Sequence, residues 1–247
     1  MRLSVVIPAF NEARRLPATL DRVTRYLACS PHWLPAEVLA VDDGSTDGTG
    51  ALAAGAGPVD GVRVTGIGHP TNRGKGAAVR TGFGAATGEV ILLCDADLAT
   101  PIEEIERLAD AVGNGVAIGS RALDRQRIEV RQPRYRDLMG RTFNLAVRLL
   151  AVPGVRDTQC GFKLFDGDLG RRLAGAQRLD GFAFDVEHLL LARHWRRPVV
   201  EVPVRWRHVE SSRVQPVRHS ADMFLDLLRL GWWRVRGHPA DRAGDRR

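Results

Sequence analysis

The stretch Glu89-Val90-Ile91-Leu92-Leu93-Cys94-Asp95-Ala96-Asp97 joins a run of apolar, strand-forming residues directly to two carboxylates. Residues two apart on an extended strand face the same side. If the strand ends at Cys94, Asp95 and Asp97 converge on one point beyond it, where carboxylate oxygens suit a hard divalent cation that keeps water or substrate phosphate as further ligands. A lone Asp-x-Asp is also typical of a turn or a helix cap, so the rest of the chain must decide.

The composition is that of an ordinary globular protein, with 247 residues of which 44% are hydrophobic and 26% charged. This length favours one α/β domain with a large core. There is no run of 18 apolar residues and no leader-like start, so we expect a cytoplasmic protein without a membrane span. The three cysteines lack CxxC spacing, which indicates neither a zinc site nor a disulfide framework.

The net charge of +7 comes from arginine, because Lys75 and Lys163 are the only lysines among 36 basic residues. These two positions are candidates for places that need a compact ammonium group. A basic chain favours an acidic partner, such as a phosphate ester or an anionic membrane surface. We expect no nucleic-acid partner, because the sequence has no recognisable binding module or aromatic-interleaved basic stripe.

Apolar runs and helical periodicity alternate along the chain, which predicts an α/β fold with a mostly parallel central sheet flanked by helices. The predicted strands cover residues 3–7, 37–41, 62–66, 90–94, 115–119 and 199–204, with a further turn-to-strand segment at 157–165. The predicted helices cover residues 11–27, 74–86, 143–150 and 185–195, and one more begins near Pro101. Residues 121–141 carry seven arginines with little periodicity, so we expect a basic, mobile loop.

The C-terminal segment has a different character, and we divide the chain into a catalytic domain, 1–215, and an amphipathic helix with a basic tail, 216–247. One helical stripe in this segment consists of Met223, Phe224, Leu227, Leu228, Trp232 and Val235. Arginines beside it, together with tryptophan, are typical of a helix that lies on a membrane surface or contacts an integral membrane partner. The alternative is that the stripe packs against the protein's own core.

A second acidic cluster, Asp42-Asp43, follows another predicted strand. Because parallel strands end at one edge of the sheet, it should lie near Asp95 and Asp97. Such carboxylates can accept hydrogen bonds from a nucleobase and ribose, while Asp47 is equally suited to helix capping.

The glycine-rich segment Asn72-Arg73-Gly74-Lys75-Gly76 is not a P-loop, because the first glycine is too distant and Gly76 replaces the required Ser or Thr. No Gly-x-Gly-x-x-Gly follows the first strand either. We interpret the glycines as allowing a tight turn into a helix, where Lys75 and the helix N-terminus favour negative charge.

Four ordered motifs now carry a resemblance. Val6 to Glu12 (VIPAFNE), Val41 to Asp47 (VDDGSTD), Asn72 to Gly76 (NRGKG) and Asp95 to Asp97 (DAD) resemble the signatures of inverting family 2 glycosyltransferases with a GT-A, Rossmann-like fold. Gly119 to Arg121 (GSR), Asp157 to Lys163 (DTQCGFK) and Phe184 to Glu187 (FDVE) are similar to segments of the dolichyl- or polyprenyl-phosphate sugar synthases. The matches cover residues 3 to 213.

The resemblance implies a set of functional residues. The nucleotide-sugar donor would be bound by Pro8, Phe10, Glu12, Asp42, Asp43, Lys75, Asp95, Ala96 and Asp97. Of these, Asp95 and Asp97 would also hold Mg²⁺ or Mn²⁺ against the donor diphosphate. The acceptor phosphate would be bound by Arg121, Arg141, Lys163 and Arg213. The residues implied in catalysis are Asp95, Asp97, Asp185 and Gln159, and a phosphate acceptor would need no general base.

Two departures from the family pattern bear on the substrate. Ala99 stands where mannosyl-type synthases tend to have a metal-binding Gln, which favours glucose from UDP-glucose over mannose from GDP-mannose. Ser211-Ser212-Arg213-Val214 differs from the Gly-Ser-Lys expected near the acceptor phosphate. A polyprenyl phosphate at the inner face of the cell membrane is the expected acceptor. The alternatives are a saccharide or small-molecule hydroxyl acceptor with Asp185 or Glu187 as base, and a non-catalytic nucleotide-sugar or membrane-surface binding protein.

Overall fold

The computed structural model describes residues 1–130, 134–209 and 216–239, with residues 134–139, 141 and 216–222 described by their backbone only. In chain order the elements are β1 (Leu3–Ala9), α1 (Leu16–Ala28), η1 (Pro31–Trp33), β2 (Ala36–Asp42), α2 (Thr49–Gly55), β3 (Val62–Gly68), α3 (Lys75–Ala85), β4 (Val90–Cys94), η2 (Ile102–Glu104), α4 (Ile105–Val112), β5 (Val116–Ser120), η3 (Arg125–Arg127), β6 (Ile128–Val130), α5 (Arg134–Leu150), β7 (Phe162–Asp166), α6 (Gly167–Ala176), α7 (Phe184–His194), β8 (Val199–Pro203), β9 (Trp206–Arg207) and α8 (Pro216–Arg236).

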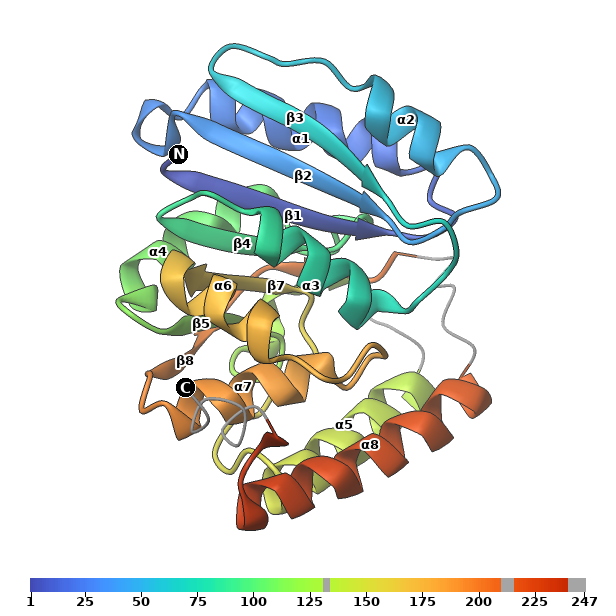
Figure 1. Cartoon of the computed structure of the whole chain (residues 1–247). Coiled ribbons are helices and arrows are strands. Elements are labelled where there is room, and N and C mark those ends of the chain that lie inside the picture. The colour runs from blue at the N-terminus through green and yellow to red at the C-terminus, as the bar shows by residue number, and fades with distance from the viewer. Residues whose placement is uncertain (131–133, 210–215, 240–247) are drawn as a thin grey trace, which may run out of the picture.

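A seven-stranded sheet with the order β3-β2-β1-β4-β7-β5-β8 forms the centre of the molecule. All its neighbouring strands run parallel except at β7, which is antiparallel to both β4 and β5. Helices α3 and α6 lie in front of the sheet in Figure 1, and α1 lies behind it. The predicted α/β architecture with a mostly parallel sheet is therefore confirmed.

The sequence explains why β1 is an inner strand of the sheet. Every residue of β1 is buried, as expected for a parallel strand covered on both faces. A Cβ atom at Gly82 of α3 would lie 2.3 Å from Val6 Cγ1, so a glycine is needed for α3 to pack this closely on the sheet.

The strand register brings the chemically important turns to one edge of the sheet. Ala9 pairs with Asp42, so the turns after β1 and β2 leave the sheet at the same level. The strand β4 ends nearby at Cys94, and its antiparallel neighbour β7 begins there, because Cys94 pairs with Phe162. The antiparallel direction of β7 thus delivers the segment before it, residues 157–161, to the edge that carries Asp95 and Asp97.

The predicted loop over residues 121–141 is wrong in its second half, because α5 already begins at Arg134 and a short strand, β6, pairs with β9. A run of arginines is compatible with a helix, since arginine is a good helix former. Helices α5 and α8 lie side by side along the lower part of Figure 1.

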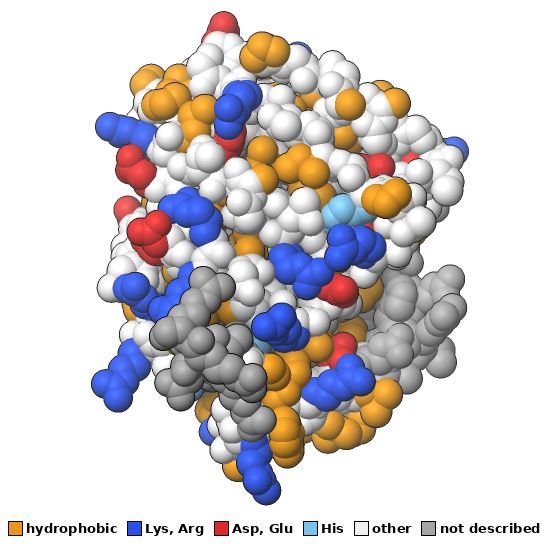
Figure 2. All heavy atoms as spheres, viewed as in Figure 1, with side chains coloured by type: hydrophobic (Ala, Val, Ile, Leu, Met, Phe, Trp, Pro, Cys, Tyr) orange, Lys and Arg blue, Asp and Glu red, His pale blue; other side chains and the backbone are white. Residues whose placement is uncertain are grey.

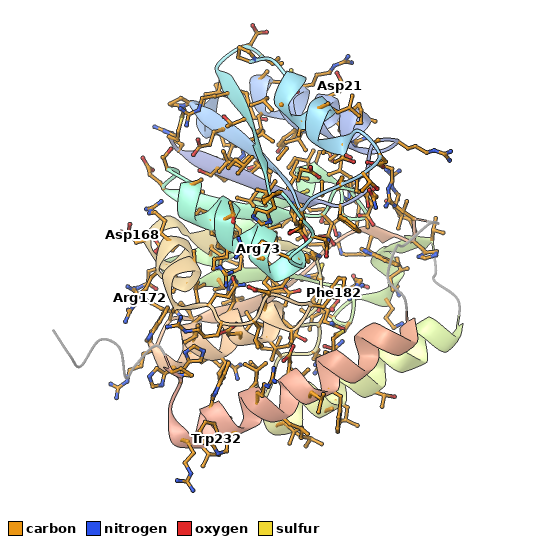
Figure 3. The ribbon with its side chains drawn as sticks, turned by 45° about the vertical axis from the view of Figure 1, so that its right-hand side comes forward. Asp21, Arg73, Asp168, Arg172, Phe182 and Trp232 are labelled. Carbon is orange, nitrogen blue, oxygen red and sulfur yellow. The ribbon has the colours of Figure 1, made fainter. Side chains whose placement is uncertain are left out.

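The helix α8 has both a buried and an exposed apolar face. Leu227 and Leu230 are buried in the core, so part of the helix packs on the domain. The large apolar side chains exposed on α5 and α8 are Leu145, Leu149, Leu150, Phe224, Leu225, Leu228, Trp232 and Val235. Figure 2 shows hydrophobic side chains gathered at this lower end of the molecule, and Trp232 extends outward from α8 in Figure 3. Within the described part of the chain, no helix is long and apolar enough to cross a membrane.

Candidate active site

The turn that carries Asp95 and Asp97 is fixed by backbone contacts from several elements. Asp95 N donates to Gly161 O (3.1 Å), and Leu98 N donates to Asp95 O (3.1 Å). Leu98 has a left-handed backbone conformation (φ 44°). Asp97 Oδ1 accepts from Ala99 N (3.0 Å). From outside the turn, Thr19 Oγ1 of α1 donates to Ala96 O (2.7 Å), and Arg207 N of β9 donates to Ala99 O (2.9 Å).

The carboxylate of Asp95 lies directly against Gly161. A Cβ atom at Gly161 would be 1.9 Å from Asp95 Oδ2, so a side chain there would displace the carboxylate. On its other side, Asp95 Oδ1 is 2.7 Å from Lys75 Nζ. The sequence prediction that Lys75 and the Asp-x-Asp turn share one site is consistent with this ion pair.

Asp43 organises the glycine turn from which Lys75 projects. Its carboxylate is contacted by His69 Nδ1 (2.7 Å), Asn72 Nδ2 (2.9 Å) and the backbone N–H groups of Arg73 and Gly74 (3.0 and 2.8 Å). Four donors occupy the acceptor positions of a carboxylate. The described contacts of Asp43 therefore fix the turn. No motif in the sequence indicates that His69 takes part.

The turns after β1 and β2 are joined by hydrogen bonds. Asn11, with φ 55°, donates its N–H to Ser45 Oγ (2.8 Å) and accepts from Thr46 N through Oδ1 (2.9 Å). Glu12 N donates to Thr49 Oγ1 (2.8 Å), and Asp42 accepts from Ser45. Among the residues predicted to bind the nucleotide-sugar donor, Pro8 is buried in β1 and the Phe10 side chain is exposed.

Lys163 and Asp185 form a buried ion pair beneath this edge. Lys163 is 1% and Asp185 is 5% exposed. Burial raises the pKa of Asp185, although the ammonium groups of Lys163 and Lys75 act in the opposite direction. The ammonium of Lys163 is therefore engaged inside the protein, which does not favour the predicted contact with an acceptor phosphate.

Glu187 is fully buried and accepts hydrogen bonds from protein groups. Its partners are the backbone N–H groups of Arg178 (2.7 Å) and Leu179 (2.9 Å), and His238 Nε2, 2.9 Å away. The carbonyls of Leu179 and Asp180 abut Gly76 and Gly74, so this segment supports the turn of Lys75. In Figure 3 the label Arg73 locates the glycine turn, and the label Phe182 locates the segment that supports it. These contacts suit a structural role for Glu187 better than that of a base.

A cavity of about 120 Å³ is lined by residues of both the predicted metal site and the predicted acceptor site. Its lining residues include Asp95, Asp97, Arg121, Gln159 and Trp206. The guanidinium of Arg121 forms a two-pronged pair with Asp157 (both 2.7 Å) and lies 5.3 Å from the ring centre of Trp206.

The electrostatics of this cavity follow from its ion pair. Although burial acts in the opposite direction, the Arg121 guanidinium lowers the pKa of Asp157. Trp206 was not predicted, because a lone tryptophan outside the recognised motifs gives no functional signal in the sequence. The side chains of Arg141 and Arg213, which complete the predicted acceptor set, lie outside the described residues.

The residues at this edge fit a divalent cation. Asp95 and Asp97 supply hard carboxylate oxygens. Burial, and after it the charge of Asp95, raises the pKa of Asp97, although Lys75 and Arg15 act in the opposite direction. Among the described residues, no three His, Cys, Asp or Glu side chains cluster as metal ligands. Mg²⁺ and similar ions are commonly held by one or two carboxylates, with water and substrate phosphate completing the shell.

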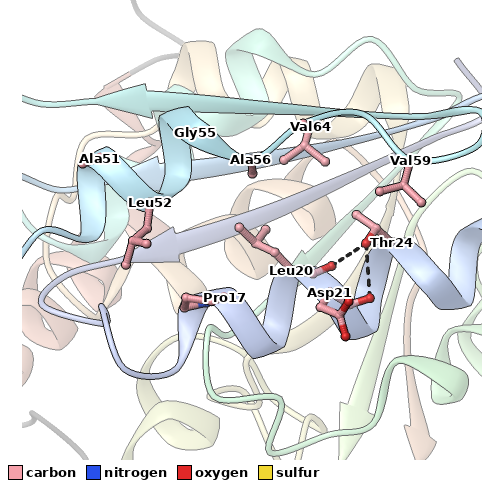
Figure 4. A pocket seen from close by; sticks show the side chains of 11 residues that line it. Pro17, Leu20, Asp21, Thr24, Ala51, Leu52, Gly55, Ala56, Val59 and Val64 are labelled. Carbon is pink, nitrogen blue, oxygen red and sulfur yellow. Dashed lines mark hydrogen bonds between the residues drawn. The ribbon is translucent and has the colours of Figure 1, made fainter.

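A larger cavity, of about 360 Å³, lies between α1, α2 and β3 (Figure 4). Its walls are mainly apolar, including Pro17, Leu52 and Val64. The polar groups drawn there, Asp21 and Thr24, belong to α1, where Thr24 bonds to backbone carbonyls. It contains none of the residues predicted to act on a substrate.

Comparison with known proteins gives a consistent result. Residues 4–169 match the family Glycosyl transferase family 2. The dolichyl-phosphate beta-glucosyltransferases of Drosophila melanogaster and Homo sapiens are each 38% identical to the chain over 95% of its length and 78% of theirs. A crystal structure of glucosyl-3-phosphoglycerate synthase from Mycobacterium tuberculosis with Mn²⁺ and UDP-glucose has a TM-score of 0.60 at 18% identity, covering 94% of this chain and 78% of that one. At this identity the structural likeness establishes the fold.

Proposed function

Since the chain belongs to glycosyltransferase family 2, and is thus a glycosyltransferase, we propose that it transfers glucose from UDP-glucose to a polyprenyl phosphate of the dolichyl type. The observation that carries the proposal is the cavity that Asp95 and Asp97 line together with Arg121. The two carboxylates suit a cation-bound diphosphate, and the guanidinium suits a phosphate acceptor. The names of the relatives support glucose and dolichyl phosphate as the substrates.

On the donor side, Asp95 and Asp97 would hold Mg²⁺ or Mn²⁺, a choice supported by the Mn²⁺ in the structurally similar synthase. The bound cation supplies charge neutralisation for the departing nucleotide diphosphate. Lys75 stands beside these carboxylates at the first residue of α3, where its ammonium and the helix N-terminus both favour phosphate oxygen. The other residues proposed to bind the nucleotide-sugar donor are Pro8, Phe10, Glu12, Asp42 and Asp43. Asp43 would act through the turn that it fixes.

On the acceptor side, Arg121 is the described cation that best suits the phosphate. Asp157 accepts from two nitrogens of the Arg121 guanidinium, and the Arg121 side chain remains 27% exposed. The attacking phosphate oxygen is already anionic, so no residue has to remove a proton from it. The engagement of Asp185 by Lys163 and of Glu187 by three donors supports this mechanism over one with a hydroxyl acceptor and a general base.

The first test is a donor panel of UDP-glucose, GDP-mannose and UDP-N-acetylglucosamine with a short polyprenyl phosphate and Mg²⁺ or Mn²⁺. We expect glucose transfer, and Asp97→Ala should lower its rate by at least about 10³-fold, because a site of transition-state charge stabilisation is lost. Asp110→Ala, at an exposed position of α4, is the matched control. Normal transfer by Asp97→Ala would refute the metal-site assignment, and preferred transfer of mannose would refute the choice of sugar.

The exposed apolar side chains of α5 and α8 form what we call the α5–α8 face, and we propose that it docks on an anionic membrane surface. Exposed Phe224, Leu228 and Trp232 supply apolar area. The exposed Arg234 and Arg236 in the last turn of α8 add positive charge at its end. Such docking would bring the site to its lipid substrate at the inner face of the membrane. Leu227 and Leu230 take no part in it, because they are buried.

Sedimentation with phosphatidylglycerol vesicles tests the α5–α8 face. The double substitution Leu228→Gln/Trp232→Gln should weaken binding about tenfold or more, since apolar burial contributes about 25 cal/mol per Å². Leu52→Gln, an exposed apolar position on α2, is the control. Truncation of α8 would be less informative, because it would also remove Leu227 and Leu230 from the core. Unchanged binding by the double variant would exclude this surface.

A further inference from the structure

Glu12, predicted from the sequence to line the nucleotide pocket, is engaged by a neighbouring arginine. Arg15 Nε lies 2.6 Å from Glu12 Oε2, and Arg15 Nη2 lies 2.5 Å from Glu12 Oε1. Both carboxylate oxygens therefore accept from one guanidinium in a two-pronged pair, and both side chains are largely shielded from solvent. This geometry fixes the plane of the guanidinium.

Arg15 stands on the side of α1 that contacts the Asp-x-Asp turn. Thr19, four residues further along, donates its hydroxyl to Ala96 O, between the two aspartates. Thr19 N in turn donates to Arg15 O (3.1 Å), and residues four apart share one face of a helix. Although burial acts in the opposite direction, Glu12 and the charges of Asp97 and Asp95 raise the pKa of Arg15. The guanidinium thus adds fixed positive charge beside the turn.

The third nitrogen of this guanidinium is not held by Glu12. Arg15 Nη1 is buried and has no hydrogen-bond partner among the described residues. A buried donor without an acceptor is unfavourable, and such groups in native proteins call for an explanation. Because Glu12 holds Nε and Nη2, Nη1 is the nitrogen that can donate to an acceptor atom of a ligand.

We propose that Arg15 binds an anionic oxygen of the donor's diphosphate, and that Glu12 is the positioning residue that holds the Arg15 guanidinium for it. The inference rests on the proposed function, because it takes a nucleoside diphosphate as the ligand. Phosphate oxygen is the acceptor that suits a desolvated, pre-oriented guanidinium next to a proposed cation site. Glu12 acts on the nucleotide through Arg15.

Calorimetric binding of UDP and uridine, with Mg²⁺ present, separates this assignment from a general effect on the pocket. Arg15→Gln should weaken UDP binding at least tenfold and change uridine binding less than twofold. Arg14→Gln is the matched control, because Arg14 is the exposed neighbour in sequence. Thermal unfolding of each variant establishes that it is folded, and Arg15→Lys, which keeps the charge without the fork, should lie between wild type and Arg15→Gln.

The role of Glu12 is tested by a double-mutant cycle. Glu12→Gln should weaken UDP binding in the wild-type background and have less than a twofold effect in the Arg15→Gln background. Additive losses, or an equal loss for uridine, would show that Glu12 contacts the nucleoside itself. If Arg15→Gln binds UDP as tightly as wild type, the diphosphate assignment is wrong. If the wild-type protein binds no UDP, the proposed donor fails instead.

Discussion

The two lysines of this arginine-rich chain each pair with an acidic side chain, but in different environments. Lys75 and Asp95 meet at the open edge of the sheet, where their side chains are 22% and 34% exposed. Lys163 and Asp185 meet inside the protein, where the corresponding values are 1% and 7%. The sequence singles out both lysines without distinguishing them. The first pair has access to a ligand, and the second belongs to the framework under it.

A cation near the proposed phosphate site therefore need not contact the phosphate. A buried pair is costly to break, because the remaining charge has no solvent, whereas a partly exposed pair is readily exchanged for another partner. We therefore assign ligand binding to Lys75 and support of the site to Lys163. Three substitutions test the contrast through the free energy of unfolding.

The largest effect is expected from Lys163→Met. The carboxylate of Asp185 would lose its counter-ion while buried, and the free energy of unfolding should fall by about 3 to 5 kcal/mol in chemical denaturation. Lys163→Met/Asp185→Leu, which removes both charges, should recover most of the loss. A double variant no more stable than Lys163→Met would contradict a buried ion pair.

An intermediate effect is expected from Gly161→Ala. The added Cβ would overlap the Asp95 carboxylate, and its displacement should cost about 1 to 3 kcal/mol of unfolding free energy, as overpacking usually does. It should also weaken Mn²⁺ binding measured by electron paramagnetic resonance. Gly84→Ala in α3, where a Cβ meets open space, should instead stabilise the protein slightly. Equal behaviour of the two alanine variants would argue against the contact between Gly161 and Asp95.

The smallest effect on stability is expected from Lys75→Met. A partly exposed ion pair contributes at most about 1 kcal/mol, so the denaturation midpoint should change little. UDP binding, measured by calorimetry, should nevertheless weaken about tenfold because a phosphate-facing cation is lost. A stability loss as large as that of Lys163→Met would remove the distinction between the two pairs.

Much of the donor side was predictable from local sequence. The apolar runs before Asp42 and Asp95 predict buried parallel strands, and parallel strands end at one edge, so the two acidic clusters had to be neighbours. The structure has both strands, and the turn of Lys75 lies beside them. The acceptor side was less predictable. Arg121 has a pattern in sequence, whereas its partners Asp157 and Trp206 lie 36 and 85 residues away along the chain.

The α/β fold, the family and the position of the Asp-x-Asp turn follow from the sequence alone, because hydrophobic periodicity and short motifs depend on residues close together in the chain. Which charges are free to meet a ligand depends on tertiary contacts. These contacts bury Lys163 against Asp185, enclose Glu187 among three donors, and leave Arg15 Nη1 without a partner among the described residues. Burial and pairing arise from contacts between segments far apart in sequence, so no local pattern specifies them.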